Sequence, residues 1–277
     1  MQLLPVLVPR QAPYHLLIDD TRDNRIAPVI ASQRLWEPAE TALFVDLLHP
    51  GLRVVDVGAH VGYFTVMFSR LCGPDGFVHA FEPEPSNHRL LCANLLVNDC
   101  SNVAAHALAL SDTAGTDELF LSPDNGGDHR LYFGAGRAHC SVRTDALDNL
   151  LADDRVDFVK IDAQGAEPRI LRGMRRLIGR ERAHLGVLME FAPGLLERYA
   201  GGLQSFMELL AALDAHAFWL RMDRNGLRLD RADHLPRFLE RLAGELAAKG
   251  EEDASGNLLV FFGEQAQRLH LSRLARA

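Results

Sequence analysis

Four acidic residues are candidates for a functional site, because each lies at the end of an apolar run typical of a buried β-strand. These residues are Asp56, Glu82, Asp162 and Glu190. The carboxyl ends of parallel strands meet at one edge of a sheet, so these side chains are expected to gather there. A carboxylate at such an edge can accept hydrogen bonds from hydroxyl groups, take up a proton or bind a cation. The sequence therefore predicts a polar site at the strand ends.

The turn after the first of these runs, VVDVGAHVGYF at residues 54–64, carries two glycines before a helical segment. A helix that begins there presents free N–H groups, and Gly58 and Gly62 have no Cβ atoms to keep a ligand from the backbone. The spacing is D-x-G-x-x-x-G, with His60 where dinucleotide sites need a second glycine to admit a pyrophosphate. Asp56 adds negative charge, so a cationic ligand without phosphates is favoured over a nicotinamide dinucleotide.

Glu82 ends the second apolar run and is followed by Pro83. A carboxylate at the tip of that strand is placed to accept both hydroxyls of a ribose, and each charge-assisted hydrogen bond contributes about 1.5–3 kcal/mol. A ribose beside a cationic group, without phosphates, indicates S-adenosyl-L-methionine as the cofactor. Asp56 and Gly58 are then expected to border its methionine part, and Glu82 its ribose.

Short β-branched runs alternate with helical patterns from about residue 52, which predicts a parallel sheet covered by helices on both faces. Strands are expected at 52–57, 76–82, 102–110, 156–162, 184–190, 216–222 and 257–263, and helices at 61–72, 85–96, 166–178 and 235–248. The first fifty residues show no clear strand before a helix at 38–48, so residues 1–50 are predicted to cover the sheet or the acceptor side of the site. Residues 113–145 are predicted to be an inserted hairpin or lid within a domain spanning 51–277.

Composition limits the class of protein. The chain has 277 residues, of which 48% are hydrophobic, and its net charge of −8 argues against a general nucleic-acid binder. Its four cysteines form no C-x-x-C pair, so neither a disulfide framework nor a zinc site is expected, and a cytoplasmic location fits. The N-terminal apolar run is too short for a signal peptide, and no segment is long enough to span a membrane. A homodimer is the default expectation.

Six blocks of the sequence, in order, resemble the FkbM-type S-adenosylmethionine-dependent methyltransferases. They are VVDVGAHVGYFTV (54–66), HAFEPEPSNHRLLCANLLVND (79–99), ALALSD (107–112), DALDNLL (145–151), VDFVKIDAQGAEPRILRG (156–173) and VLMEF (187–191). The resemblance implies a Rossmann-like class I methyltransferase fold, with seven mostly parallel strands of which the last is antiparallel. It also implies O-methylation of a sugar, polyketide or other natural-product or glycan hydroxyl, and it places Ser111 and Asp112 beside the adenine.

Two positions depart from the family pattern. His60 stands where Asn is usual, in the methionine-binding turn, and its imidazole can still donate to the ligand carboxylate. Gln164 replaces Glu in KIDAQG and removes a carboxylate beside the presumed acceptor, so no metal site is predicted. These two changes leave open a non-catalytic module that binds S-adenosylmethionine.

An alcohol acceptor must lose its proton during methyl transfer, which calls for a base. Asp162 is the first candidate, although it could instead cap the following helix. Glu190 is the second, and His106 in the third strand is another, although a histidine there is more often a core residue. His129 and His139 could reach the site from the inserted segment. Magnesium held by Asp162 and Glu190 is a less favoured alternative, and a nitrogen or carbon acceptor stays open.

Overall fold

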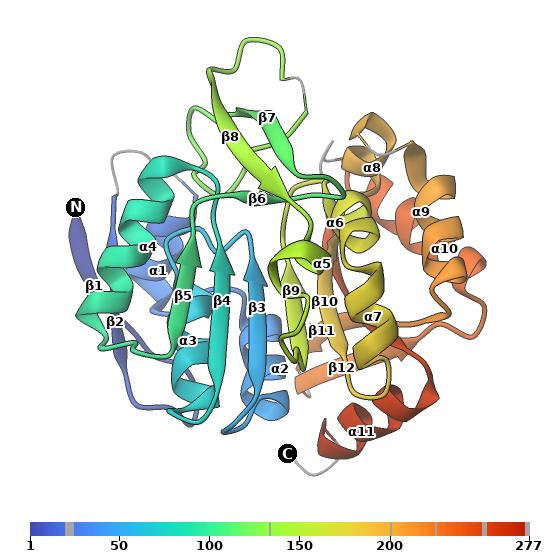
Figure 1. Cartoon of the computed structure of the whole chain (residues 1–277), viewed down its shortest axis with the longest axis horizontal. Helices are drawn as coiled ribbons and strands as arrows, with labels where there is room; N and C mark the ends of the chain where they lie inside the picture. Colours follow the sequence, from blue (N-terminus) through green and yellow to red (C-terminus); the bar gives the residue numbers. More distant parts are fainter. Residues whose placement is uncertain (20–24, 133, 200, 225, 251–253, 275–277) are drawn as a thin grey trace.

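The computed structural model describes residues 1–19, 25–132, 134–199, 201–224, 226–250 and 254–274, and its centre is an eight-stranded sheet (Figure 1). In spatial order the strands are β12 (Gly226–Arg231), β11 (Ala215–Asp223), β13 (Gly256–Phe262), β10 (Gly186–Phe191), β9 (Phe158–Ile161), β3 (Arg53–Val57), β4 (Phe77–Phe81) and β5 (Val103–His106). The strand order reverses between β3 and β9. In doubly wound sheets this is where ligands bind, at the carboxyl ends of the strands.

The strand directions confirm the expected class I methyltransferase arrangement. β5, β4, β3, β9 and β10 pair in parallel, whereas β13, the last strand of the chain, lies antiparallel between β10 and β11. The expected number of seven strands was too low, because β12 adds an eighth through an antiparallel hairpin with β11. Its sequence, GLRLDR, is short and charged and no residue in it is fully buried, so its apolar signal is weak.

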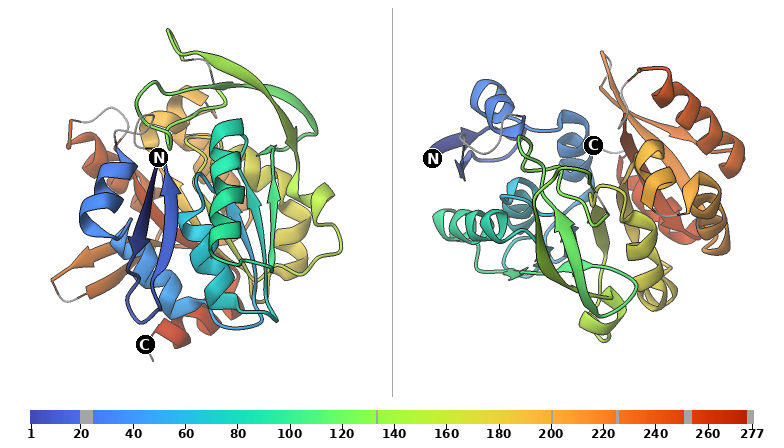
Figure 2. Two further views of the ribbon diagram at one scale, coloured as in Figure 1. Left: turned by 90° about the vertical axis from the view of Figure 1, so that its left-hand side faces the viewer. Right: turned by 90° about the horizontal axis from the view of Figure 1, so that it is seen from above.

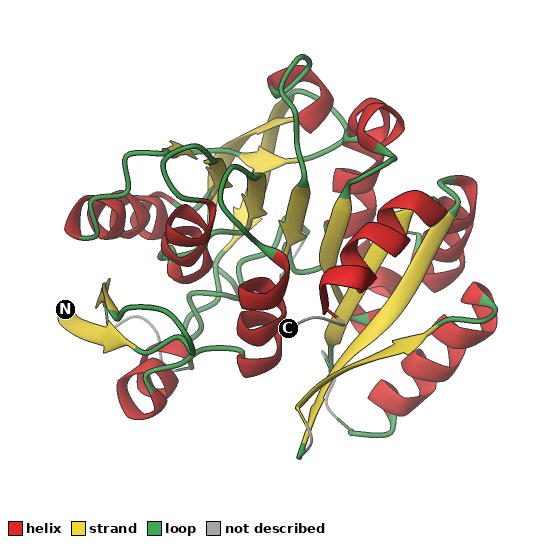
Figure 3. Cartoon of the chain, turned by 90° about the horizontal axis from the view of Figure 1, so that it is seen from below, coloured by secondary structure: helices red, strands yellow, loops and turns green. Residues whose placement is uncertain are grey.

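Helices cover both faces of the sheet, so two apolar cores lie on either side of it (Figure 3). One core includes side chains of α1 (Ile26–Gln33), α2 (Pro38–Leu47), α3 (Tyr63–Cys72), α4 (Pro85–Val97) and α11 (Glu264–Leu274). The other includes side chains of α5 (Leu147–Leu150), α6 (Glu167–Gly173), α7 (Arg175–Glu181), α8 (Pro193–Tyr199), α9 (Gly202–Ala212) and α10 (Leu235–Ala247). No described helix combines the length and apolar character needed to cross a membrane.

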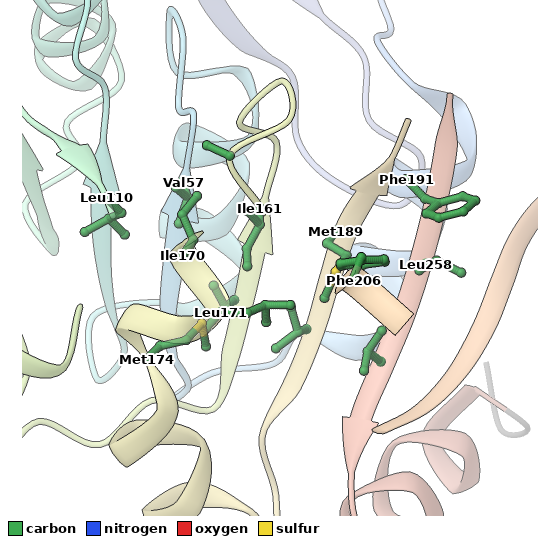
Figure 4. Close-up of a cluster of buried hydrophobic side chains, with 14 of the residues drawn as sticks. Val57, Leu110, Ile161, Ile170, Leu171, Met174, Met189, Phe191, Phe206 and Leu258 are labelled. Carbon is green, nitrogen blue, oxygen red and sulfur yellow. The ribbon is translucent and has the colours of Figure 1, made fainter. Parts of the chain in front are cut away.

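Strand side chains alternate between these two cores, because successive residues of a strand point to opposite faces. Val54 belongs to one core and Val55 to the other. In the second core, Ile170 and Leu171 of α6 and Phe206 of α9 lie over the sheet (Figure 4). This packing sets the position of α6 over β9. It therefore also positions the turn between them, which carries Asp162.

Two expected elements are each split into two shorter ones. The strand expected at 102–110 ends at His106, and Ala109–Leu110 forms β6 in a separate three-stranded sheet with β8 (His139–Asp145) and β7 (Gly115–Phe120). The helix expected at 166–178 breaks at Met174, whose backbone (φ −121°, ψ 21°) is not helical. Gly173 packs against the backbone that follows β6, where a Cβ would overlap the carbonyl oxygen of Ser111.

The first fifty residues contain two strands, β1 (Gln2–Val6) and β2 (Tyr14–Ile18), so the expectation of no strand before residue 38 was wrong. An isolated hairpin is marginal in water, but β2 lies along α4 (Figure 2). Asn98 on α4 hydrogen-bonds to both backbone groups of His15 (2.7 and 3.1 Å), and Asn94 does the same for Leu17 (3.0 and 2.6 Å). Two asparagines one helical turn apart thus take the place of a neighbouring strand.

Candidate active site

A cavity of about 760 Å³ lies at the carboxyl ends of β3, β4, β9 and β10. The inserted segment closes it from above with residues 125–131, and residues 25–26 and 36–37 of the N-terminal part close one side. Asn87, at the start of α4, donates a hydrogen bond of 2.9 Å to the carbonyl of Gly126 and so ties the inserted segment over the cavity. All four acidic residues predicted at the strand ends line this one cavity: Asp56, Glu82, Asp162 and Glu190.

Three residues with left-handed backbone build the turn between β3 and α3: Gly58 (φ 76°), His60 (φ 52°) and Gly62 (φ 93°). The protein itself fills the space where the glycines lack a Cβ. A Cβ on Gly58 would overlap the carbonyl oxygen of Asp162, and one on Gly62 would lie 2.8 Å from a methyl group of Leu91. This packing, rather than the close approach of a ligand expected from the sequence, accounts for both glycines. Gly58 and His60 line the cavity, and Gly62 lies outside its described lining.

Asp56 is almost completely buried at the end of β3, with 1% of its surface exposed. Its Oδ2 accepts a hydrogen bond of 2.6 Å from the Thr65 hydroxyl, while its Oδ1 has no hydrogen-bond partner among the described residues. Burial raises the pKa of Asp56, an effect that Lys160 and Thr65 oppose. An unsatisfied buried polar group costs about 1–3 kcal/mol. A cationic group bound in the cavity would remove this cost, so Asp56 fits the amino group of a methionine moiety.

Glu82 is buried at the end of β4 and is held by two backbone N–H groups. His60 donates to its Oε2 at 2.8 Å, and Glu84 donates to its Oε1 at 2.9 Å. A carboxylate has about four acceptor positions, so capacity remains for the two hydroxyls of a ribose. Burial raises the pKa of Glu82 to about 7, despite these two hydrogen bonds. The sequence identified the carboxylate but not its tie to the glycine turn through His60.

The structure places Ser111 and Asp112 outside the described lining of the cavity, so their contact with the adenine stays a prediction. The chain bends away after β6, and Asp112 faces α6, where Arg169 and Arg172 donate to its two carboxylate oxygens at 3.3 and 3.4 Å. The wall at this end of the cavity is apolar instead. It consists of Leu108, Ala109, Leu110, Leu119, Leu131 and Ile170. An apolar wall of this kind fits a flat ring, but its residues have no motif by which the sequence could single them out.

At the other end of the cavity, Asp162 directly follows β9 and has 32% of its side chain exposed. Lys160 Nζ lies 3.2 Å from its Oδ2, and the Gln164 amide donates to its Oδ1 at 3.0 Å. The same amide nitrogen donates to Glu190 Oε2 at 2.9 Å. The N-cap residue of the next helix, α6, is Ala166, so Asp162 does not cap this helix. The structure thus brings Asp162 and Glu190 together, with Gln164 between them.

The charges at this end are predominantly acidic and largely buried. Burial raises the pKa of Glu190 well above its ordinary value, and the neighbouring Asp162 and Glu167 add to this rise. Burial likewise raises the pKa of Glu37, with Glu40 contributing. Burial alone would lower the pKa of Lys160, but Asp162 and other acids outweigh it and raise the pKa. The Lys160 ammonium is therefore the stable partner of Asp162.

The predicted histidines are not brought together at the site. His106 lies outside the described cavity lining: its ring stacks on Phe81 at 4.5 Å between centroids and contacts His79 at 3.3 Å. This packing in the edge of the sheet does not favour His106 as the base, and that role stays a prediction. His139 is half exposed beside Glu118 on the outer hairpin. Of the three, His129 lines the cavity, and its Nδ1 accepts from the Ser122 N–H at 3.0 Å.

The sequence predicted that residues 1–50 cover the sheet or the acceptor side, but it singled out none of the residues from this segment that line the cavity, such as Arg25, Trp36 and Glu37. It also missed Ser255, which lines the cavity from the C-terminal part. These residues stand outside any recognisable motif, and only the Glu-Pro pair at 37–38 marks a helix start. Within the part of the chain that the structure describes, no three His, Cys, Asp or Glu residues are arranged to hold a metal ion. Between Asp162 and Glu190 the Gln164 amide presents N–H donors, whereas a cation there would need oxygen ligands.

Comparison with protein families and known proteins gives consistent matches. The family model described as the methyltransferase FkbM domain matches residues 56–224. The methyltransferase sdnD of Sordaria araneosa is 30% identical over 156 residues, which cover 44% of this chain and 60% of that protein. The 31-O-demethyl-FK506 methyltransferase FkbM of Streptomyces tacrolimicus is 39% identical over 77 residues, which cover 28% of this chain and 29% of that protein.

Among solved structures, the methyltransferase FkbM from Methylobacillus flagellatus is similar with a TM-score of 0.46 and 15% identity. The similarity covers 87% of this chain and 56% of that chain. The matches to the curated relatives span at most 60% of the length of those proteins. What these comparisons establish is therefore the family match at residues 56–224, which contains β4, β9, β10, the last two residues of β3 and the acidic residues at the ends of these strands.

Proposed function

The chain belongs to the FkbM family of methyltransferases, with S-adenosyl-L-methionine as its cofactor, and we propose that it methylates a hydroxyl oxygen. The acceptor is a sugar, a polyketide or another natural-product or glycan hydroxyl compound. One observation carries this proposal. Asp162, a partly exposed carboxylate, faces the same cavity as Asp56 and Glu82, and its backbone carbonyl packs against Gly58 of the cofactor turn.

The residues of the cofactor end bind and orient. Glu82 accepts the ribose hydroxyls while the His60 and Glu84 N–H groups hold its carboxylate in place. Asp56 offers its unpartnered Oδ1 to the amino group. The bound cofactor supplies an electrophilic methyl group whose sulfonium leaves as a neutral thioether. Because no charged leaving group needs stabilising, much of the rate comes from orientation, to which effective molarities of about 10⁵–10⁸ M can contribute.

The acceptor end removes a proton. Asp162 Oδ1 and Oδ2 each face an N–H donor, from Gln164 and Lys160, and both contacts hold the carboxylate in place. Its exposed part accepts the hydrogen of the acceptor hydroxyl, and the proton passes to Asp162 as the oxygen gains the methyl group. A positioned base of this kind contributes about 10²–10⁴-fold to the rate.

The test measures transfer of isotope-labelled methyl groups from S-adenosylmethionine to a panel of glycosylated and polyketide alcohols, with amines in parallel. Asp162→Asn should lower turnover by about 10²-fold or more while cofactor affinity changes less than about threefold. Asp75→Asn, in the exposed turn before β4, is the matched control and should retain full activity. Transfer to amines alone would contradict the proposal, and equal turnover of Asp162→Asn would remove this residue from the reaction.

A further inference from the structure

Gln164 occupies an unusual position in the turn after β9. Its backbone is left-handed (φ 52°) and is followed by Gly165 (φ 100°), so the chain reverses sharply after Ala163. Glu167 holds this reversal, because its Oε1 accepts a hydrogen bond of 3.1 Å from the Ala163 N–H. A non-glycine residue in this conformation stores strain of about 1–3 kcal/mol, which is common at functional sites. The strained backbone is part of the geometry that brings the Gln164 amide between two carboxyl groups.

Both hydrogens of one amide nitrogen are used in this arrangement. Gln164 Nε2 lies 3.0 Å from Asp162 Oδ1 and 2.9 Å from Glu190 Oε2. Two carboxyl oxygens offer acceptors, so the nitrogen of the amide, and not its oxygen, faces them. Lys160 Nζ takes the remaining oxygen of Asp162 at 3.2 Å. Asp162 thus has a donor at each of its two carboxylate oxygens.

Glu190 has a different environment on the other side of the same amide. Carboxyl groups face it from three elements, namely Asp162 after β9, Glu167 of α6 and Glu37 at the start of α2. The Ser255 hydroxyl also hydrogen-bonds to it. Because the nearest ammonium, that of Lys160, is engaged by Asp162, the surroundings of Glu190 favour a neutral carboxylic acid.

We propose that Gln164 is a positioning residue: its amide donates to Asp162 and to Glu190 at once, and so holds the Asp162 carboxylate toward the acceptor. The catalytic role in this inference rests on the proposed function. The hydrogen bonds from Gln164 to Asp162 and Glu190, however, are present without acceptor or turnover. An amide can perform this role because it donates two hydrogen bonds and never ionises. A glutamate at the same position would replace two donors with a third acidic group between two others.

The experiment follows the titration of side-chain carboxyl groups by ¹³C NMR in the whole, cofactor-free protein. Gln164→Glu adds one carboxyl group at the proposed position, and Gln204→Glu adds one on the exposed face of α9 as the matched control. Loss of one resonance in Glu190→Gln identifies Glu190. The added group at position 164 should titrate at least one pH unit above the ordinary glutamate value of about 4.3, a tenfold or greater rise in proton affinity. The added group at position 204, beside Glu208 on the exposed face of α9, should titrate less than one pH unit above that ordinary value.

Gln164→Met keeps the proposal testable if the glutamate variant fails to fold. It preserves the length of the side chain and removes both donors, so the Glu190 and Asp162 resonances should shift in the cofactor-free protein. The proposal is overturned if the carboxyl group at position 164 titrates at its ordinary value, or if Gln164→Met leaves both resonances unchanged. These results do not depend on methyl transfer, so failure of the proposed function appears separately, as absence of transfer with the hydrogen bonds of Gln164 intact.

Once an acceptor is found, the pH profile of turnover distinguishes a positioning role from a merely structural one. In the wild-type protein position 164 carries no ionisable group that could compete with Asp162. In Gln164→Glu, the acidic limb of the kcat profile should move to higher pH by at least about one unit, while affinity for S-adenosylmethionine stays within about threefold. A lower kcat with an unshifted profile would contradict the proposed role and leave Gln164 as packing alone.

Discussion

The ribose-binding role of Glu82 leads to the most quantitative prediction. Glu82→Gln preserves the size of the side chain but leaves one acceptor oxygen instead of two. In the native structure Oε1 and Oε2 each accept one backbone N–H, at 2.9 and 2.8 Å. The new NH₂ group must therefore face either the His60 or the Glu84 N–H, and one hydrogen bond to the cofactor is lost as well. We expect affinity to fall by about 2–3 kcal/mol, which is a 30- to 150-fold weaker Kd.

Isothermal titration calorimetry with S-adenosylhomocysteine measures this change without an acceptor. Glu84→Gln is the matched control, because Glu84 is also buried at the start of α4 but uses its Oε2 to accept from the Asn87 N–H at 2.6 Å. A glutamine oxygen can keep that helix cap, so affinity should change less than about threefold. Equal affinities for Glu82→Gln and the wild-type protein would refute the ribose assignment.

The same site predicts a pH dependence with a definite sign. In the cofactor-free protein the pKa of Glu82 is raised to about 7 by burial. Hydroxyl groups bind the ionised form, so affinity should be full above pH 7 and should weaken toward tenfold per unit below it. The Glu82→Gln variant should show a nearly flat dependence over the same range. A wild-type affinity that is constant between pH 6 and pH 8 would show that the protonation state of Glu82 does not matter.

Three further predictions concern other parts of the molecule. Gly58→Ala should lower the free energy of unfolding in urea by about 2–4 kcal/mol, since its Cβ would overlap the Asp162 carbonyl. Gly51→Ala (φ 86°) has open space at its Cβ and should lower it by only about 1–2 kcal/mol. Burial lowers the pKa of His270 to about 4, so the unfolded chain binds more protons than the native protein between about pH 4 and pH 6.5. Stability should therefore rise with pH across that window, less so in His270→Gln. Chelator treatment should leave activity unchanged because the Gln164 amide fills the place of a cation, and loss restored by magnesium would contradict this.

Much of the fold could be predicted because its elements carry strong local signals. The central strands are short β-branched runs buried on both faces, and the helices between them show helical spacing or end at glycine. Where prediction failed, tertiary contacts decided the outcome. The β1–β2 hairpin depends on Asn94 and on Asn98, the C-cap residue of the same distant helix. β6 separates from β5 because it pairs with β8, a strand about thirty residues further along the chain.

The residues of the candidate site, like the elements of the fold, could be predicted only in part. Asp56, Glu82 and Asp162 were found from the sequence because a carboxylate at the end of a buried strand is a visible signal. Ser111 and Asp112 lie outside the described lining of the cavity, since the direction of the chain after β6 is set by a sheet that joins residues far apart in the sequence. The apolar wall and Glu37 were missed because side chains that acquire a role only through the fold look like ordinary core or helix-start residues.

The central claim, a cavity built for S-adenosylmethionine and not for a dinucleotide, is tested most directly by parallel calorimetric titrations. The purified protein is titrated with S-adenosylmethionine, S-adenosylhomocysteine and NAD under the same conditions. We predict micromolar binding of the first two, which corresponds to about −8 kcal/mol, and no binding of NAD. Binding of NAD alone would contradict the account, because His60 and Asp56 would then stand in a pyrophosphate site.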